Sequence, residues 1–138
     1  MKIKVQPDLE KARSIIKIIE SRKKFVETYK NKIYSTVICE NYYEIIKELA
    51  TALCLSRGFK FVGKYAHKEL IEMTVNLVNL DESFLFFLDD LRQRRNGSLY
   101  YGEEFGDNYL VNNQKKFNEI IEKIEKELNN KIEGSDEK

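Results

Sequence analysis

Apolar side chains recur along most of the chain at spacings of three, four and seven residues, which gather side chains on one face of an α-helix. This pattern predicts five helices, over residues 8–29, 32–55, 64–79, 81–102 and 107–132. No segment of useful length alternates apolar and polar residues with the period of two that is typical of a half-buried strand. We therefore predict an all-α fold, an antiparallel up-and-down bundle of about five helices.

Residues that favour helix ends stand at several of the predicted boundaries. Asp8 suits the start of the first helix and Asp81 the N-cap of the fourth, whereas Gly58 suits the end of the second. The connections are short, and 138 residues are about the length of one domain. We expect a single helical domain over residues 1–132 and a disordered tail over 133–138.

Composition excludes several functional classes. The 24 Lys and Arg residues against 23 Asp and Glu give a formal net charge of +1, so any affinity for phosphate must be local. A single histidine excludes a multi-histidine metal centre, and the sequence has no glycine-rich phosphate loop. We expect neither a metal nor a cofactor.

The cysteines and the histidine fall within helical patterns. Cys39 and Cys54 lie outside any Cys-x-x-Cys or Cys/His cluster and are expected to be buried thiols. We expect His67 to be a half-buried bundle residue, with a general base as the alternative. The sequence shows no secretory signal and no apolar run near the ~18 residues that span a bilayer. We therefore expect a cytoplasmic protein without a membrane partner.

Three arginines follow the apolar part of the fourth predicted helix. At about 100° per residue, Arg95 falls on the same face as a stripe of apolar residues. The stripe consists of Phe84, Phe87, Leu88 and Leu91. Because arginine keeps its charge, Arg95 needs an acidic partner, a wet cleft or an anionic ligand at that position. This makes Arg95 a candidate site residue.

The other two arginines have acidic residues at helical spacing. Asp89 lies three residues before Arg92, and Asp90 lies four residues before Arg94. These are the spacings of ion pairs on a helix surface, so Arg92 and Arg94 are weaker candidates for binding a ligand.

A short motif at the end of this helix resembles the HEPN (higher eukaryotes and prokaryotes nucleotide-binding) superfamily, whose signature is Arg, often followed by Asn, and then His four to six residues after the Arg. Arg95-Asn96 match its first two positions, Gly97-Ser98-Leu99 form the spacer, and Tyr100 stands where the histidine belongs. Residues 42–53 and 67–71 look like the second and third helices of that domain. The resemblance spans roughly residues 30–128.

Membership of that superfamily would imply a helical bundle that dimerises so that two arginine motifs line one cleft. Many members cleave RNA without a metal ion: the histidine supports attack of the 2′-hydroxyl, and the arginine stabilises the phosphate. Many prokaryotic members are toxins paired with a small nucleotidyltransferase, and others bind nucleotides or RNA. The resemblance therefore implies a homodimer and a nucleotidyltransferase partner.

Tyr100 separates binding from catalysis. A phenol, with a reference pKa of about 10, is a poor general base at pH 7, but it can still donate to a phosphate or stack on a base. We predict an RNA- or nucleotide-binding protein, a degenerate metal-independent ribonuclease with weak or absent cleavage. The candidate catalytic residues are Arg95, Asn96 and Tyr100. The candidate residues for binding RNA or phosphate are Arg92, Arg94, Arg95 and Tyr101.

Two alternatives stay open. In an unbroken helix Arg95 and Tyr100 point about 140° apart, so either the helix bends near Asn96 or the ligand meets Arg94 and Tyr101. The second alternative is a non-catalytic dimeric interaction module, in which a carboxylate satisfies Arg95 and the tyrosines form a protein interface.

Overall fold

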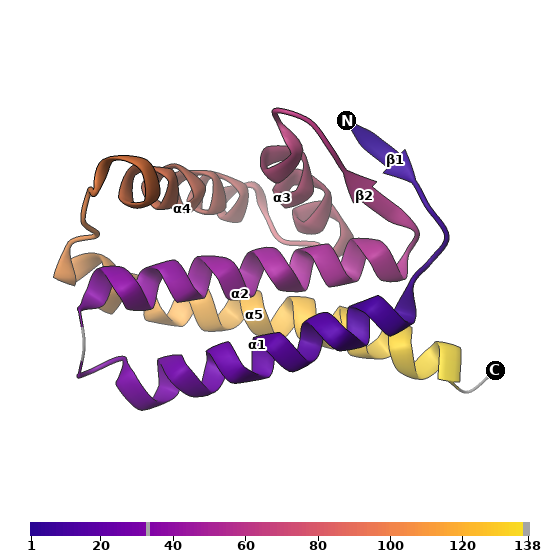
Figure 1. Cartoon of the computed structure of the whole chain (residues 1–138), viewed down its shortest axis with the longest axis horizontal. Helices are drawn as coiled ribbons and strands as arrows, with labels where there is room; N and C mark the ends of the chain where they lie inside the picture. The colour runs from indigo at the N-terminus through magenta and orange to yellow at the C-terminus, as the bar shows by residue number, and fades with distance from the viewer. Residues whose placement is uncertain (33, 137–138) are drawn as a thin grey trace.

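The amphipathic segments fold as an all-α bundle, which confirms the predicted class. The computed structural model describes residues 1–32 and 34–136, and five helices and one small sheet lie within them (Figure 1). In chain order they are β1 (Lys2–Lys4), α1 (Leu9–Tyr29), α2 (Ser35–Ser56), β2 (Phe59–Phe61), α3 (Ala66–Leu77), α4 (Glu82–Tyr101) and α5 (Asp107–Asp136). Helices α1, α2, α4 and α5 lie along the long axis and run in alternately opposite directions (Figure 1). The shorter α3 lies obliquely between β2 and α4 (Figure 1).

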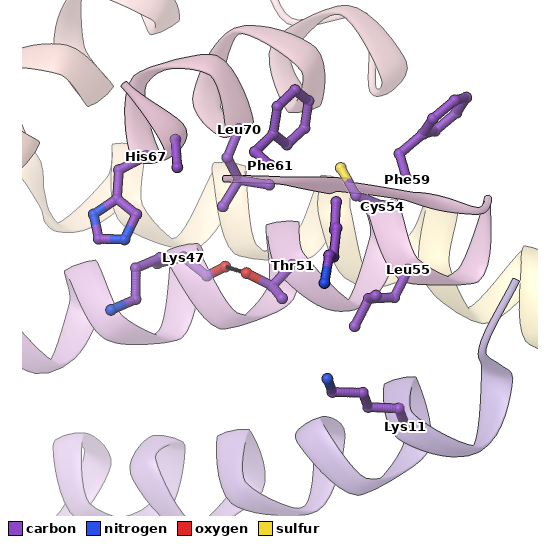
Figure 2. A pocket seen from close by; sticks show the side chains of 11 residues that line it. Lys11, Lys47, Thr51, Cys54, Leu55, Phe59, Phe61, His67 and Leu70 are labelled. Carbon is purple, nitrogen blue, oxygen red and sulfur yellow. Dashed lines mark hydrogen bonds between the residues drawn. The ribbon is translucent and has the colours of Figure 1, made fainter. Parts of the chain in front are cut away.

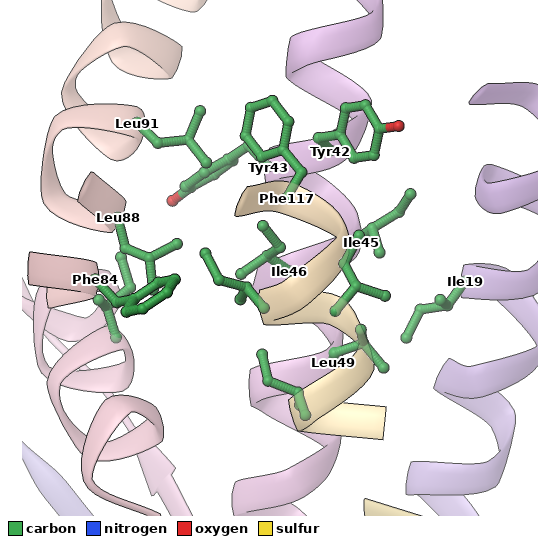
Figure 3. Packing of buried hydrophobic residues seen from close by; sticks show 14 of the residues in the cluster. Ile19, Tyr42, Tyr43, Ile45, Ile46, Leu49, Phe84, Leu88, Leu91 and Phe117 are labelled. Carbon is green, nitrogen blue, oxygen red and sulfur yellow. The ribbon is translucent and has the colours of Figure 1, made fainter. Parts of the chain in front are cut away.

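Helix α2 is the centre of the bundle. Its apolar residues surround most of its circumference, and a helix of that composition is stable only when it is covered on several sides. It packs against α1, α5, α3 and α4. Figure 3 shows Phe84, Leu88 and Leu91 of α4 pointing toward α2, so the predicted apolar stripe of α4 lies in the core.

Helix α5 closes the other side of this core. Phe117 is fully buried, and its ring stacks on Tyr42 of α2 with the centroids 4.5 Å apart. Both cysteines are buried free thiols, as predicted. Within the described residues, no helix combines the length and apolar character needed to cross a membrane.

The helix ends follow the predicted signals. Asp8 accepts a hydrogen bond from the Lys11 backbone N–H, and Asp81 accepts one from the Ser83 backbone N–H, both at 2.9 Å. Gly58, with φ of 85°, adopts the left-handed conformation just after α2. Helix α5 continues to Asp136, so the predicted tail begins inside the helix. Residues 137 and 138 lie outside the described part of the chain.

The sheet was not predicted, because its strands are only three residues long. Strand β1 pairs antiparallel with β2, with Ile3 opposite Lys60. The Val5 N–H then donates to the Gly58 carbonyl and the Asp8 N–H to the Leu55 carbonyl, both at 2.9 Å. These bonds hold the start of α1 against the end of α2.

Candidate functional site

Helix α4 divides the predicted site residues among different sides. It is helical without interruption from Glu82 to Tyr101, so of the two alternatives left open by the sequence, the bend near Asn96 is absent. Consecutive side chains therefore point about 100° apart. The candidate residues therefore point in different directions, and the structure does not bring them together at one point.

Arg95 faces α2 and has acidic partners there. Its Nη1 lies 2.7 Å from a carboxylate oxygen of Glu40, and its Nε lies 3.7 Å from one of Glu44. The Arg95 side chain is 17% exposed. The Ser98 hydroxyl donates to Glu40 at 3.2 Å, and the Arg95 Nη1 lies 3.4 Å from that hydroxyl oxygen. The sequence analysis required an acidic partner, a wet cleft or an anionic ligand for Arg95, and the structure shows the acidic partner.

Arg94 points toward α5. It donates to Asp90 at 2.7 Å, and its guanidinium lies 4.5 Å from the centroid of the Tyr109 ring. Asp90 and the favourable position over the ring hold this guanidinium in place. The predicted ion pair of Asp90 and Arg94 is confirmed. Arg94 therefore makes its contacts with residues of this chain.

Arg92 faces the start of α3. It donates to one oxygen of Asp89 from Nε at 3.1 Å and from Nη2 at 2.9 Å, which confirms the other predicted ion pair. Arg92, Asn96 and Tyr100 follow one another at intervals of four residues, which places them along one face of α4.

That face lines a cavity of about 510 Å³, which we call the α3–α4 cavity. Its lining residues come from the loop before α3, the first turn of α3 and the second half of α4. They are Gly63, Lys64, Tyr65, Ala66, His67, Lys68, Arg92, Asn96 and Tyr100.

The chemistry of this lining is cationic and aromatic. None of its residues is acidic, and among the described residues neither Lys64 nor Lys68 has a carboxylate partner. The Lys64 ammonium lies 5.6 Å from the centroid of the Tyr65 ring. Ammonium and guanidinium groups bind phosphate oxygens, and phenol rings offer surfaces on which a nucleobase stacks. The arrangement is therefore suited to a phosphate with an attached base.

His67 was expected to be a half-buried bundle residue, but it is exposed and lines this cavity. Partial desolvation lowers the pKa of His67, and the nearby positive charges of Lys47 and Arg92 lower it further against the opposing effect of Glu44. Desolvation and the two cations therefore favour the neutral imidazole, the form that can accept a proton.

The two tyrosines at the end of α4 differ in position. Tyr100 is 70% exposed and lines the cavity, whereas Tyr101 is 79% exposed and is not among the lining residues. The predicted phosphate-binding set is thus divided, because only Arg92 of Arg92, Arg94, Arg95 and Tyr101 borders the cavity. Of the predicted catalytic set, Asn96 and Tyr100 border it and Arg95 does not.

Sequence reasoning missed the half of the site that α3 provides. Lys64, Tyr65 and Lys68 stand in a basic and aromatic cluster at the predicted start of a helix, and that composition was the available signal. Its position beside α4 depends on tertiary packing.

Comparisons with known proteins found no relative of this chain. No family model, no curated protein and no solved structure matches the chain. Within the described residues, no group of three or more His, Cys, Asp and Glu is arranged to hold a metal ion.

Proposed function

We propose that this chain is a HEPN-like protein that binds single-stranded RNA or a nucleotide at the α3–α4 cavity. The observation that carries the proposal is the convergence of Lys64, Lys68 and Arg92 with two tyrosines in a cavity without an acidic lining residue. The cations would contact phosphate oxygens, and Tyr65 and Tyr100 would stack on bases.

This proposal changes the role of the motif arginine. Glu40 pairs with Arg95 at 2.7 Å and Glu44 lies 3.7 Å away, so we assign Arg95 a role within the fold, holding α4 to α2. Asn96 and Tyr100 keep the ligand-facing roles that the HEPN resemblance implies. Arg92 supplies the guanidinium, through the N–H groups that its pair with Asp89 does not engage. Assembly as a homodimer and pairing with a nucleotidyltransferase remain part of the proposal.

Neighbouring residues of α4 provide matched tests. Binding of a fluorescein-labelled single-stranded RNA, followed by anisotropy, should weaken in Arg92→Gln and stay unchanged in Arg94→Gln. Likewise Tyr100→Ala should cost about 1–3 kcal/mol for each base stacked, whereas Tyr101→Ala should cost nothing measurable. Equal losses in both members of each pair would refute this location for the site.

The lysines are tested through the salt dependence of binding. Each phosphate contact on a single strand contributes about 0.7 to the slope of log affinity against log salt. Lys64→Gln and Lys68→Gln should each reduce the slope by about that amount, and the exposed Lys123 of α5 provides the control substitution Lys123→Gln. An unchanged slope in both cavity variants would contradict the proposal.

A second candidate function, a dimeric interaction module, has its own supporting observation. An interaction module requires that a carboxylate satisfies Arg95, and Glu40 does so. Such a module also needs exposed apolar and aromatic side chains, and Leu99, Tyr100 and Tyr101 are all exposed at the end of α4. Sedimentation of wild type and Tyr101→Ala separates the two functions: a dimer lost in Tyr101→Ala, with no RNA bound by either protein, supports the interaction module.

A further inference from the structure

The α3–α4 cavity is bounded on one side by α3 residues that it shares with a second cavity. Ala66 and His67 line both, and the second cavity, of about 290 Å³, lies between α3, β2 and α2. Figure 2 shows this second cavity, with the His67 ring at its edge beside Lys47 of α2. Ala66 and His67 therefore form a wall between the two cavities, and a ligand in the α3–α4 cavity does not continue past them toward β2.

The α4 face of the α3–α4 cavity is covered at one end and open at the other. Tyr100 is 70% exposed, whereas the Arg92 side chain is 22% exposed. The two residues are eight positions apart, which is about 12 Å along the helix axis. The charge of Arg92 acts on His67, so Arg92 lies close to the wall. The cavity therefore has a covered end at Arg92 and His67 and an open end at Tyr100.

Hydrogen-bond donors dominate the chemistry of this cavity. Arg92 has five N–H groups, and its pair with Asp89 engages two of them, from Nε and Nη2. The other three can donate to a ligand. Lys64 and Lys68 add two ammonium groups that have no carboxylate partner within residues 1–32 and 34–136. Tyr65, the N-cap of α3, makes no side-chain cap hydrogen bond, so the first-turn backbone N–H groups also lack an acceptor from that side chain.

The two kinds of phosphate in a nucleic acid differ in how they can reach these donors. An internal phosphodiester has a single negative charge, and the chain continues on both sides of it. A terminal phosphomonoester has a charge of about −1.5 to −2 at pH 7, three acceptor oxygens and the chain on one side only. Because Ala66 and His67 form the wall, a phosphate at the covered end leaves room for the chain only toward Tyr100. The covered end is therefore suited to a terminal phosphate.

We propose that the α3–α4 cavity binds the phosphomonoester end of a nucleotide or of an RNA strand, with the phosphate beside Arg92 and His67 and the attached base on Tyr100. The cavity volume of about 510 Å³ is typical of a small-molecule site, which suits one terminal nucleotide. This inference rests on the proposed function and narrows its ligand, since an internal stretch of strand meets only the open end of the cavity.

The test compares three single-stranded RNAs of one sequence, each with fluorescein inside the strand, by anisotropy. They carry a 5′-phosphate, a 3′-phosphate or hydroxyls at both ends. One of the phosphorylated RNAs should bind about tenfold more tightly than the unphosphorylated RNA, because the dianion gains charge-assisted hydrogen bonds. The tighter one identifies the end that is bound.

Two competitors separate the sources of the terminal phosphate. A circular RNA of the same sequence has no end, so it should compete no better than the unphosphorylated strand. A nucleoside monophosphate that competes as well as the phosphorylated RNA identifies a free nucleotide as the ligand. Weaker competition by the nucleoside monophosphate identifies a strand end, and the nucleoside without phosphate should not compete in either case.

Neighbouring arginines locate the phosphate. Arg92→Gln should reduce the preference for the phosphorylated end to less than about threefold, and Arg94→Gln should leave it unchanged. The inference is overturned if RNA binds at this cavity and the three strands bind within about twofold of one another. It is also overturned if the circle competes as well as the phosphorylated strand, or if the preference survives in Arg92→Gln. By contrast, equal losses of RNA binding in Arg92→Gln and Arg94→Gln refute the proposed function itself, so the two failures are distinguishable.

Discussion

Replacing Arg95 by methionine tests whether the motif arginine belongs to the fold or to a ligand. Methionine keeps much of the length of the side chain while removing the charge, so Glu40 and Glu44 lose the guanidinium and packing changes little. If Arg95 holds α4 to α2, the variant should lose stability and still bind RNA. If Arg95 binds the ligand, the opposite pattern is expected.

The magnitude follows from how exposed the three side chains are. Arg95 is 17% exposed, Glu40 is 26% and Glu44 is 20%. Breaking a fully buried ion pair costs about 3–5 kcal/mol, and an exposed pair contributes about 0.2–1 kcal/mol. Water reaches both carboxylates, and Glu44 retains Lys47 at 2.9 Å. We therefore expect Arg95→Met to lower the free energy of unfolding by about 2 kcal/mol.

Urea denaturation followed by circular dichroism measures this loss, with Arg94→Met as the control for a more exposed pair. A double-mutant cycle with Glu40→Gln should give a coupling energy of about 1 kcal/mol between Arg95 and Glu40. The reasoning is refuted if Arg95→Met changes stability by less than about 0.5 kcal/mol while RNA affinity falls tenfold or more. That result would show Arg95 to be a ligand-binding residue.

Three further outcomes follow from the core and the cavity. Phe117→Ala should lower the free energy of unfolding by about 3–5 kcal/mol in the same urea assay, because its ring is fully buried and stacked. At pH 8 neither cysteine should react with a thiol reagent until denaturant is added, since burial raises the pKa of Cys39 to about 12 and that of Cys54 to about 11. Metal-free incubation should leave RNA largely intact, because Tyr100 is a poor base. Cleavage that persists in Tyr100→Phe but is lost in His67→Ala would instead identify His67 as the base.

Local signals in the sequence were enough to predict the five helices and several of their ends. Asp81 and Gly58 act through hydrogen bonds and backbone conformation within a few residues, so their effects need no knowledge of the rest of the fold. The inward direction of Arg95 followed from the periodicity of α4 for the same reason. The pairing of β1 with β2 was missed, because three residues give too little alternation to separate a strand from a loop.

The sequence alone could not predict which residues pair when they lie far apart along the chain. Glu40 and Glu44 lie more than fifty positions before Arg95, and other carboxylates in the chain were equally plausible partners by type. The α3–α4 cavity depends in the same way on the approach of Lys64 and Lys68 to Arg92. A motif alignment selects residues by order along the chain, whereas a helix distributes consecutive residues around its axis. The alignment therefore grouped Arg95 with Tyr100, although they lie on different sides of α4.

The carboxylate of Glu44 links the motif arginine to the surroundings of His67. One of its oxygens lies 3.7 Å from the Arg95 Nε, and the other lies 2.9 Å from the Lys47 ammonium. Lys47 in turn lowers the pKa of His67, which lines the α3–α4 cavity. These charges form a connected series from α4 through α2 to the first turn of α3. The charge of Arg95 therefore acts on the same carboxylate that offsets Lys47, and Glu44 and Lys47 act in opposite directions on the pKa of His67.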